Sequence, residues 1–390
     1  MKKAISLLLA LAILCLPLAG CAQSDQPDEP SQTEPQEPAE PQEPTEPTEP
    51  TEPVEPVQPT EPEPTEPEEP EVPAWEWQYG TPEEHGLDGS VLSSLHDTYD
   101  TTQILASVVF KDGHIVDEYY KDGYDETTPF LLHSSSKSVT SALVGIAIEQ
   151  GYIEGVDVPL SEYFPEILEF EDERWGRITL WHLLTHTSGI DCSDTGYWDA
   201  WRNSDNWIEY TFSRPITSEP GTVFDYATSN THLLSAIVQI ATGQTLYEFG
   251  KENLFDPVGM ESVTCDTDPQ GISDGGNGFH MSIYDMIRFG ILYLNGGVWQ
   301  GQQIVPAQWV EDSTSLQFER STGSADYGYQ WWVRTFGDEA YPAYFAQGHA
   351  GQYIFVVPAL ELVIAYTSNH TGGSSSMYWQ FVNDIVAACD

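Results

Sequence analysis

The chain has 390 residues and a formal net charge of −49, because 62 Asp and Glu face only 13 Lys and Arg. This balance excludes a protein that binds nucleic acid by neutralising phosphates, and it disfavours docking on an anionic lipid surface. Hydrophobic residues make up 40% of the chain, which is enough for a sizeable core. We therefore expect a folded protein whose ligands are not polyanions.

The first 21 residues are typical of a bacterial export signal. Lys2 and Lys3 precede an apolar run over residues 4–18, which is too short to span a bilayer comfortably. The small residues before Cys21 resemble the lipobox of bacterial lipoproteins, which implies a lipid anchor on Cys21. We expect an extracytoplasmic protein anchored to the bacterial cell membrane. An ordinary signal peptide with an incidental cysteine is the alternative.

Residues 22–73 have the composition of a stalk. They hold sixteen of the 28 prolines and seventeen acidic residues, but neither Lys nor Arg. A proline falls at every third position from Pro35 to Pro62, which matches the three-residue turn of polyproline II. Such a segment cannot bury a core. We predict a disordered, extended and charged spacer between the anchor and a folded domain over residues 74–390.

Strand and helix patterns place a sheet at both ends of the folded domain. Residues 88–98 begin with Asp88 as N-cap and predict a short amphipathic helix. Turn residues separate two pairs of β-rich runs, at 106–110 and 115–120 and again at 352–357 and 362–366. A last helix is expected over 377–388. The middle of the domain is dominated by helical patterns and by loops rich in Gly and Asp. We predict an α+β fold, in which an antiparallel sheet built from both ends is flanked by helices and a mainly helical region is inserted.

The sharpest chemical feature is Ser134 with Lys137, at the start of an apolar helical pattern that ends near Gly151. Residues three apart share a helix face, so the lysine amine can reach the serine hydroxyl. A serine is a poor nucleophile until a base takes its proton. Lysine can be that base only if burial and the positive end of the helix lower its pKa. The alternative is a serine N-cap followed by a surface lysine, which the apolar surroundings disfavour.

Two other patterns compete with this one. Residues 271–275 fit G-x-S-x-G, but that nucleophile elbow needs a strand before it and a helix after it, and loop residues stand on both sides. His182 and His186 lie four apart and could share a metal ion. No third ligand is near, so packing or helix capping is favoured and no metal is expected. Three cysteines of the domain specify neither a disulfide pair nor a zinc site: Cys192, Cys265 and Cys389.

Five stretches together resemble the motifs of one family, in its order along the chain. They are residues 134–145, 182–189, 224–231, 327–332 and 349–352. They resemble the serine β-lactamase and D-alanyl-D-alanine carboxypeptidase superfamily, in its class C-like branch with esterases and 6-aminohexanoate-dimer hydrolases. The resemblance covers residues 79–390 and implies the serine β-lactamase and penicillin-binding-protein fold.

The resemblance also implies roles for single residues. Ser134 would attack a carbonyl and become acylated, while Lys137 and Tyr226 would share the general acid–base work. Tyrosine ordinarily ionises near pH 10, so Tyr226 can take part only with a cation beside it. The backbone N–H groups of Ser134 and Gln352 would form the oxyanion hole. No cofactor is implied.

Two departures from the family pattern bear on the substrate. Thr228 stands where the family's tyrosine motif usually has Asn, and His349-Ala350-Gly351 replaces its late K-T-G triad. Lysine there holds a substrate carboxylate, whereas histidine is mostly neutral at pH 7. We therefore expect Thr228, His349 and Gly351 to bind a small-molecule or peptide-like ester or amide, rather than a β-lactam. The alternatives are a penicillin-binding sensor and a non-catalytic binding lipoprotein. The oligomeric state stays open.

Overall fold

A computed structural model describes residues 75–390, apart from residues 321–322, 324, 373 and 390. The predictions for the signal peptide, for Cys21 and for the stalk over residues 22–73 lie outside the described residues. Among the described residues, no helix has both the length and the apolar character that crossing a membrane requires.

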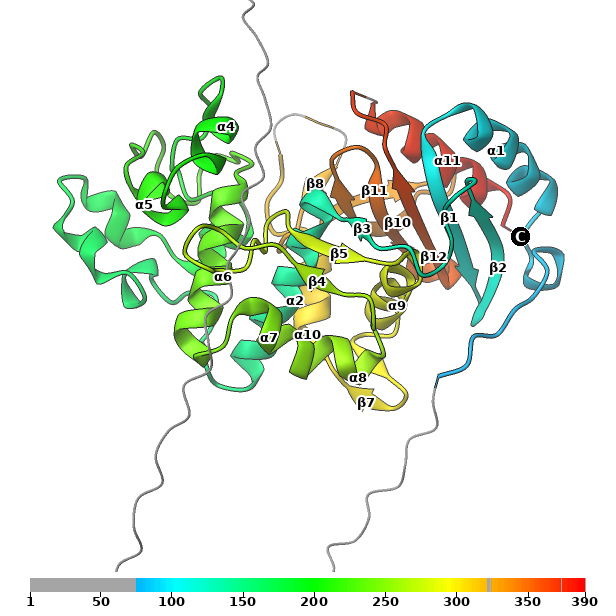
Figure 1. The fold of residues 1–390 in the computed structure, drawn as a ribbon, viewed down its shortest axis with the longest axis horizontal. Coiled ribbons are helices and arrows are strands. Elements are labelled where there is room, and N and C mark those ends of the chain that lie inside the picture. The colour runs from blue at the N-terminus through cyan, green and yellow to red at the C-terminus, as the bar shows by residue number, and fades with distance from the viewer. Residues whose placement is uncertain (1–74, 321–322, 324, 373, 390) are drawn as a thin grey trace, which may run out of the picture. The chain divides into compact units, whose positions relative to one another are not determined.

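The described part contains a seven-stranded antiparallel sheet with the strand order β2-β1-β12-β11-β10-β9-β8, on the right in Figure 1. Its strands are β1 (Ile104–Lys111), β2 (His114–Tyr120), β8 (Asp326–Tyr327), β9 (Trp332–Phe336), β10 (Tyr341–Gly348), β11 (Gln352–Val357) and β12 (Leu362–Ser368). Strand β1 pairs with β12, so strands from the two ends of the domain lie next to each other in the sheet. Both predicted hairpins are present. In the first, Asp112 and Gly113 have φ angles of 48° and 84°, the left-handed conformation that a two-residue hairpin turn requires.

The terminal helices α1 (Gly89–Thr101) and α11 (Ser375–Ala387) cover one face of the sheet and lie side by side (Figure 1). The Asp88 side chain accepts a hydrogen bond from the Ser90 N–H at 2.9 Å, which confirms the predicted N-cap. Helix α1 ends three residues later than predicted, and α11 begins two residues earlier. On the opposite face, α9 (Ile283–Leu294) packs on β11 and β12.

The inserted region between β2 and β8 is mainly helical, as predicted. Its helices are α2 (Ser136–Glu149), α3 (Leu180–Leu184), α4 (Tyr197–Arg202), α5 (Trp207–Phe212), α6 (Thr228–Thr242), α7 (Leu246–Gly250), α8 (Asp256–Val258), α9 and α10 (Ala307–Thr314), with a π-helical turn η6 (Lys251–Phe255) and the 3-10 helices η2 (His133–Ser135), η3 (Leu160–Glu162), η4 (Pro165–Glu169) and η5 (Glu173–Arg177). Two small sheets complete it, one from β3 (Phe130–Leu131), β5 (Phe279–Met281) and β4 (Thr264–Cys265), the other from β6 (Val298–Trp299) and β7 (Gln302–Gln303). The α+β class with an inserted helical region is therefore confirmed.

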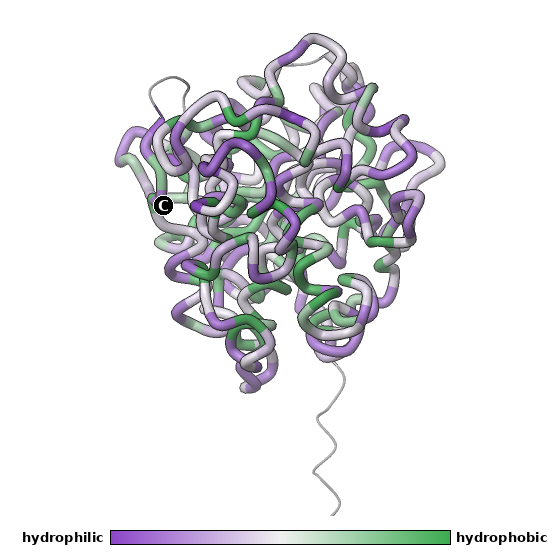
Figure 2. Tube along the Cα trace, turned by 90° about the vertical axis from the view of Figure 1, so that its left-hand side faces the viewer, coloured by the Kyte–Doolittle hydropathy of each residue, from purple (hydrophilic) through white to green (hydrophobic). Residues whose placement is uncertain are grey.

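Helix α2 is the buried centre of this region. Residues 136–147 are all buried, and α6, α7 and α10 pack against the helix. At Gly145 the helix touches α10 so closely that a Cβ atom would lie 2.3 Å from the Trp309 ring, so only glycine fits there. Hydrophilic residues instead lie in most of the outer loops (Figure 2). Packing on several sides fixes the start of α2, which carries Ser134 and Lys137.

Candidate active site

The nucleophile candidate Ser134 lies in the 3-10 turn η2, immediately before α2. His133 begins this turn with a φ of 48°, a strained conformation for a residue with a side chain. The Ser135 hydroxyl donates to the Gln352 carbonyl at 2.9 Å and so ties the turn to β11. A Cβ atom on Gly348 would lie 2.1 Å from the Leu132 carbonyl oxygen, so β10 also approaches the turn closely. Contacts with strands β10 and β11 thus fix the turn in place, and Ser134 stays partly exposed.

Lys137 is buried, with 1% of its surface exposed, and all its hydrogen-bond partners are neutral oxygens. Its Nζ atom donates to Ser134 Oγ at 3.1 Å, to Thr228 Oγ1 at 3.0 Å and to the Gly276 carbonyl at 2.7 Å. Burial lowers the pKa of Lys137 to about 7, although the Asp274 carboxylate opposes the shift. A neutral amine has two hydrogens and one lone pair. Donation to Thr228 and Gly276 leaves that lone pair directed at Ser134.

Tyr226 lies beside the same pair, at the entrance to α6. Its ring centroid is 5.0 Å from Lys137 Nζ, and the ring stacks on Trp332 at 5.7 Å. Burial raises the pKa of Tyr226 to about 12, and a hydrogen bond with the Ser134 side chain opposes this shift. At neutral pH the phenol is therefore protonated and can donate a hydrogen bond. The structure brings Ser134, Lys137 and Tyr226 together, although Tyr226 is about ninety residues away in sequence.

His186 is a residue of the site that the sequence analysis did not assign to it. The imidazole is fully buried and lies against the Tyr226 ring, with 4.5 Å between centroids. The Ala227 N–H donates to His186 Nδ1 at 3.4 Å. Burial, and secondarily the charge of Lys137, holds the pKa of His186 well below its usual range, so the ring is neutral. His186 therefore holds the tyrosine and the residue after it in place.

Among the described residues, His182 and His186 have no third ligand beside them with which to bind a metal ion. His182 caps helix α3, because its Nδ1 atom accepts from the Thr179 N–H at 2.9 Å. This is the capping role that the sequence favoured. Across the described ranges, no three His, Cys, Asp or Glu side chains stand close enough to hold one metal ion.

The G-x-S-x-G stretch is a loop without the strand and helix of a nucleophile elbow. Strand β4 ends at Cys265, and the next helix starts only at Ile283. The Ser273 hydroxyl is buried and accepts from the Tyr247 N–H at 3.2 Å. The loop instead leads to Gly276, whose carbonyl accepts a hydrogen bond from Lys137 Nζ.

A cavity of about 390 Å³ opens beside Ser134. It is lined by Ser134, Tyr226, Trp332, Gln347, Gly348, His349, Ala350, Gly351, Tyr353, His370, Gly372, Ser375 and Tyr378. His349 is exposed, and its ring meets that of His133 edge to face at 5.4 Å. Gly351 has a φ of 94° and directly precedes Gln352 at the start of β11. Thr228 does not line the cavity, since its hydroxyl contacts Lys137 instead.

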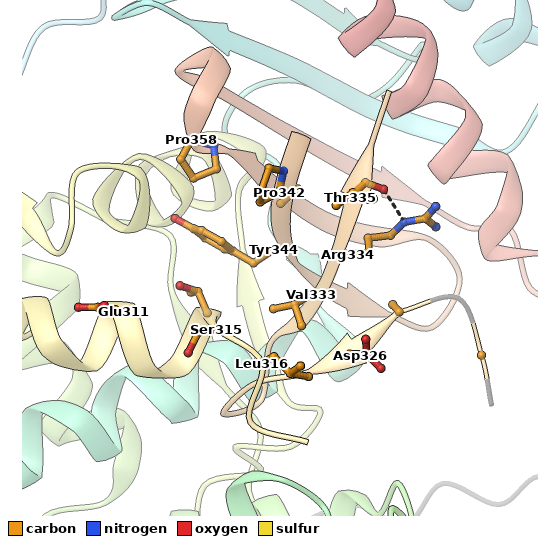
Figure 3. A pocket seen from close by; sticks show the side chains of 14 residues that line it. Glu311, Ser315, Leu316, Asp326, Val333, Arg334, Thr335, Pro342, Tyr344 and Pro358 are labelled. Carbon is orange, nitrogen blue, oxygen red and sulfur yellow. Dashed lines mark hydrogen bonds between the residues drawn. The ribbon is translucent and has the colours of Figure 1, made fainter. Parts of the chain in front are cut away.

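A larger hollow of about 750 Å³ lies between the end of α10 and strands β8 to β10 (Figure 3). Its wall includes Glu311, Leu316, Asp326, Arg334 and Tyr344. Its described lining includes neither Ser134 nor any lysine or histidine, whereas the smaller cavity contains Ser134 and Tyr226. The smaller cavity beside Ser134 is therefore the candidate active site.

The chain matches the family model described as "Beta-lactamase" over residues 99–386. It is 26% identical over 263 residues to the 6-aminohexanoate-dimer hydrolase of Paenarthrobacter ureafaciens, covering 62% of this chain and 67% of that protein. It is 25% identical over 340 residues to penicillin-binding protein 4 of Amycolatopsis lactamdurans, covering 76% of this chain and 84% of the relative.

Among solved structures, it is similar to a Bacillus anthracis protein provisionally assigned as a 6-aminohexanoate-dimer hydrolase. That similarity has a TM-score of 0.66 and 25% identity, and it covers 75% of this chain and 80% of the other. The family match, the relatives and the fold agree: the chain belongs to the beta-lactamase family and is a serine hydrolase of that fold.

Proposed function

We propose that the protein hydrolyses ester or amide bonds of small or peptide-like molecules through an acyl-enzyme on Ser134. One observation carries this proposal: a buried lysine amine lies 3.1 Å from the serine hydroxyl with neutral partners only. With the pKa of Lys137 near 7, a large share of the amine is unprotonated at neutral pH. The amine can therefore take the hydroxyl proton as Ser134 attacks the substrate carbonyl.

Tyr226 supplies the acid in this mechanism. Its phenol is protonated, since the pKa is raised to about 12, and the ring stands over the lysine amine. It can protonate the leaving oxygen or nitrogen, and the Lys137 ammonium beside it then restores the phenol proton. In deacylation the same pair activates water, and the ester bond between Ser134 and the acyl group breaks. The free acid leaves and the serine hydroxyl is restored.

The oxyanion hole in this proposal consists of the backbone N–H groups of Ser134 and Gln352. The Ser135 hydroxyl donates to the Gln352 carbonyl, which ties the turn that carries Ser134 to the strand that begins at Gln352. Such preorganised donors stabilise the negative charge that develops on the carbonyl oxygen. Gly351, with its left-handed φ, shapes the main chain just before Gln352.

The substrate class follows from what lines the cavity. None of the described residues that line it is Lys or Arg, so they offer a carboxylate no permanent positive charge. This favours esters and amides over β-lactams, as His349 in the place of a lysine already suggested. The name of the Paenarthrobacter relative, a dimer hydrolase, supports an oligoamide-like substrate. We also propose that the enzyme works outside the cytoplasm, anchored to the membrane through Cys21.

Labelling of the full chain with a fluorophosphonate probe tests the central claim. We expect covalent labelling that Ser134→Ala abolishes and that the matched variant Ser273→Ala, in the G-x-S-x-G loop, retains. Labelling that survives Ser134→Ala would overturn the assignment. A penicillin adduct that persists for hours, without turnover of any ester, would instead identify a penicillin-binding sensor.

A further inference from the structure

Three buried polar atoms without a partner gather around Ser368, next to the candidate cavity. Within the described residues, the Tyr378 hydroxyl, His370 Nδ1 and Gln352 Oε1 make no hydrogen bond. The amide of Gln352 donates to the Ser368 carbonyl at 2.6 Å, and the His370 N–H donates to the Ser368 hydroxyl at 3.1 Å. Burial raises the pKa of Tyr378, and the Ser368 hydroxyl beside it opposes this shift without completing a hydrogen bond of ordinary geometry.

Tyr378 is the most constrained of these groups. It is 2% exposed, and its ring packs on Tyr353 with 4.6 Å between centroids and on Phe381 at 6.2 Å. A Cβ atom on Gly351 would lie 1.9 Å from the Tyr378 hydroxyl, so this hydroxyl lies against the turn between β10 and β11. Aromatic packing thus holds a hydroxyl in the cavity wall, beside the residue that precedes Gln352.

Burying a polar group without a hydrogen bond is unfavourable, so such groups in native proteins require an explanation. A site that recognises a polar ligand group provides one, because the ligand completes the missing hydrogen bond. Such a site also rejects analogues that lack the group, since its own polar atoms then stay unpaired.

The chemistry of the wall indicates which group fits. We call Gln347, His370, Ser375 and Tyr378 the Tyr378 wall; all four line the cavity. The Gln347 amide donates to the Ser375 hydroxyl at 3.1 Å, and that hydroxyl in turn interacts with the Tyr353 phenol, where it opposes the rise in pKa that burial causes. None of the lining residues that the structure describes is acidic, in a chain with 62 Asp and Glu, so they offer a cationic group no counter-charge. The wall is rich in donors and suits a neutral oxygen acceptor.

We propose that the Tyr378 wall is a specificity subsite that binds a second carbonyl oxygen of the substrate, that of an amide next to the scissile bond. The enzyme then prefers peptide-like acyl groups to plain alkyl acyl groups of the same length. This inference rests on the proposed hydrolase function, because the subsite lies in the cavity that contains Ser134.

The test compares esters of one chain length on the full chain. We would measure kcat/KM for p-nitrophenyl N-acetyl-β-alaninate, which carries an amide, and for p-nitrophenyl hexanoate, which does not, each relative to its alkaline hydrolysis rate. The monoester of adipic acid and the ester of 6-aminohexanoic acid add a carboxylate and an ammonium arm. Tyr378→Phe removes the hydroxyl alone. Tyr293→Phe is the matched control, because that hydroxyl is equally buried and without a hydrogen-bond partner in the described part, but does not line the cavity.

We expect the wild type to prefer the amide ester, and Tyr378→Phe to lower its kcat/KM about tenfold while the hexanoate value changes less than about twofold. Tyr293→Phe should change neither. Equal losses for both esters, no loss for either, or a loss confined to the adipate arm would overturn the inference. In each of those results the hydrolase itself stands, because the esters are cleaved. If neither ester is cleaved and Ser134 takes no fluorophosphonate, the proposed function fails and this inference fails with it.

Discussion

The two sides of the cavity use their polar atoms differently. Around Lys137 three oxygen atoms lie within 3.1 Å of Nζ, so the two hydrogens of the neutral amine have acceptors in Thr228 and Gly276 and its lone pair faces Ser134. Around Tyr378, buried polar atoms stay without partners in the described structure. A complete network holds reacting groups in position before the substrate arrives, whereas an incomplete one is completed by the substrate. The comparison separates a part of the site built for chemistry from a part built for recognition.

Removing the base should have the largest effect. We expect Lys137→Met to lower kcat/KM for p-nitrophenyl hexanoate at least about 10³-fold, because the serine loses its proton acceptor. The matched control is Lys111→Met, since Lys111 is also buried but pairs with Asp112 in the first hairpin. Steady-state kinetics on both variants measure the difference. Comparable activity in the two would show that the satisfied network is structural rather than catalytic.

The pH dependence of kcat/KM should report the protonation of Lys137. Protonation of Lys137 removes its lone pair, so kcat/KM should fall about tenfold for each pH unit below the pKa near 7. Above that pH the amine is neutral and the rate should level off. A pH–rate profile between pH 5 and 9 measures this limb. A flat profile from pH 5 to 7 would exclude Lys137 as the base.

The third effect concerns one acceptor of the network. Thr228→Val keeps the shape of the side chain but removes the hydroxyl that accepts from Lys137, so the amine is less well oriented. We expect kcat to fall about tenfold with little change in KM, since Thr228 does not line the cavity. Thr228→Ser, which keeps the hydroxyl, should retain most of the activity. A rise in KM with unchanged kcat would instead return Thr228 to the substrate-binding role that the sequence predicted.

The smallest effect should come from a charge that acts on Lys137 through space. Asp274 is buried, forms an ion pair with Arg202 and raises the pKa of Lys137. Asp274→Asn removes this charge, so the acid limb of the pH–rate profile should move to lower pH. Asp285→Asn is the control, because Asp285 is equally buried but contacts Ser262 and Arg288. A shift to higher pH, or an equal shift in the control, would contradict this electrostatic role.

The sequence predicted those features whose cause is local. Ser134 and Lys137 are three residues apart, and the first hairpin turns at Asp112 and Gly113, so neighbouring residues determine both. Tyr226 could be selected only through the order of family motifs, because nothing in its local sequence sets it apart from other tyrosines.

Other site residues depend on contacts that sequence spacing does not encode. The Gly276 carbonyl accepts a hydrogen bond from Lys137, which is 139 positions away in the sequence. Tyr378 faces the cavity only because α11 packs on the sheet. His182 and His186 have the spacing of a metal-binding pair, but the contact of His186 with Tyr226 arises from the loop that follows α3. Long-range packing determined these positions, and a single sequence gives no measure of it.

The close approach at Gly348 restricts how the enzyme can change during evolution. Since any larger residue there would push strand β10 away from the turn that carries the serine, mutations at this end of the strand should lower catalytic activity. Helix α11 lines the cavity with Ser375 and Tyr378 and lies outside the strand that packs against the serine turn. New substrate preferences should therefore arise by drift in that C-terminal segment, while the region around Gly348 stays fixed among descendants of this enzyme.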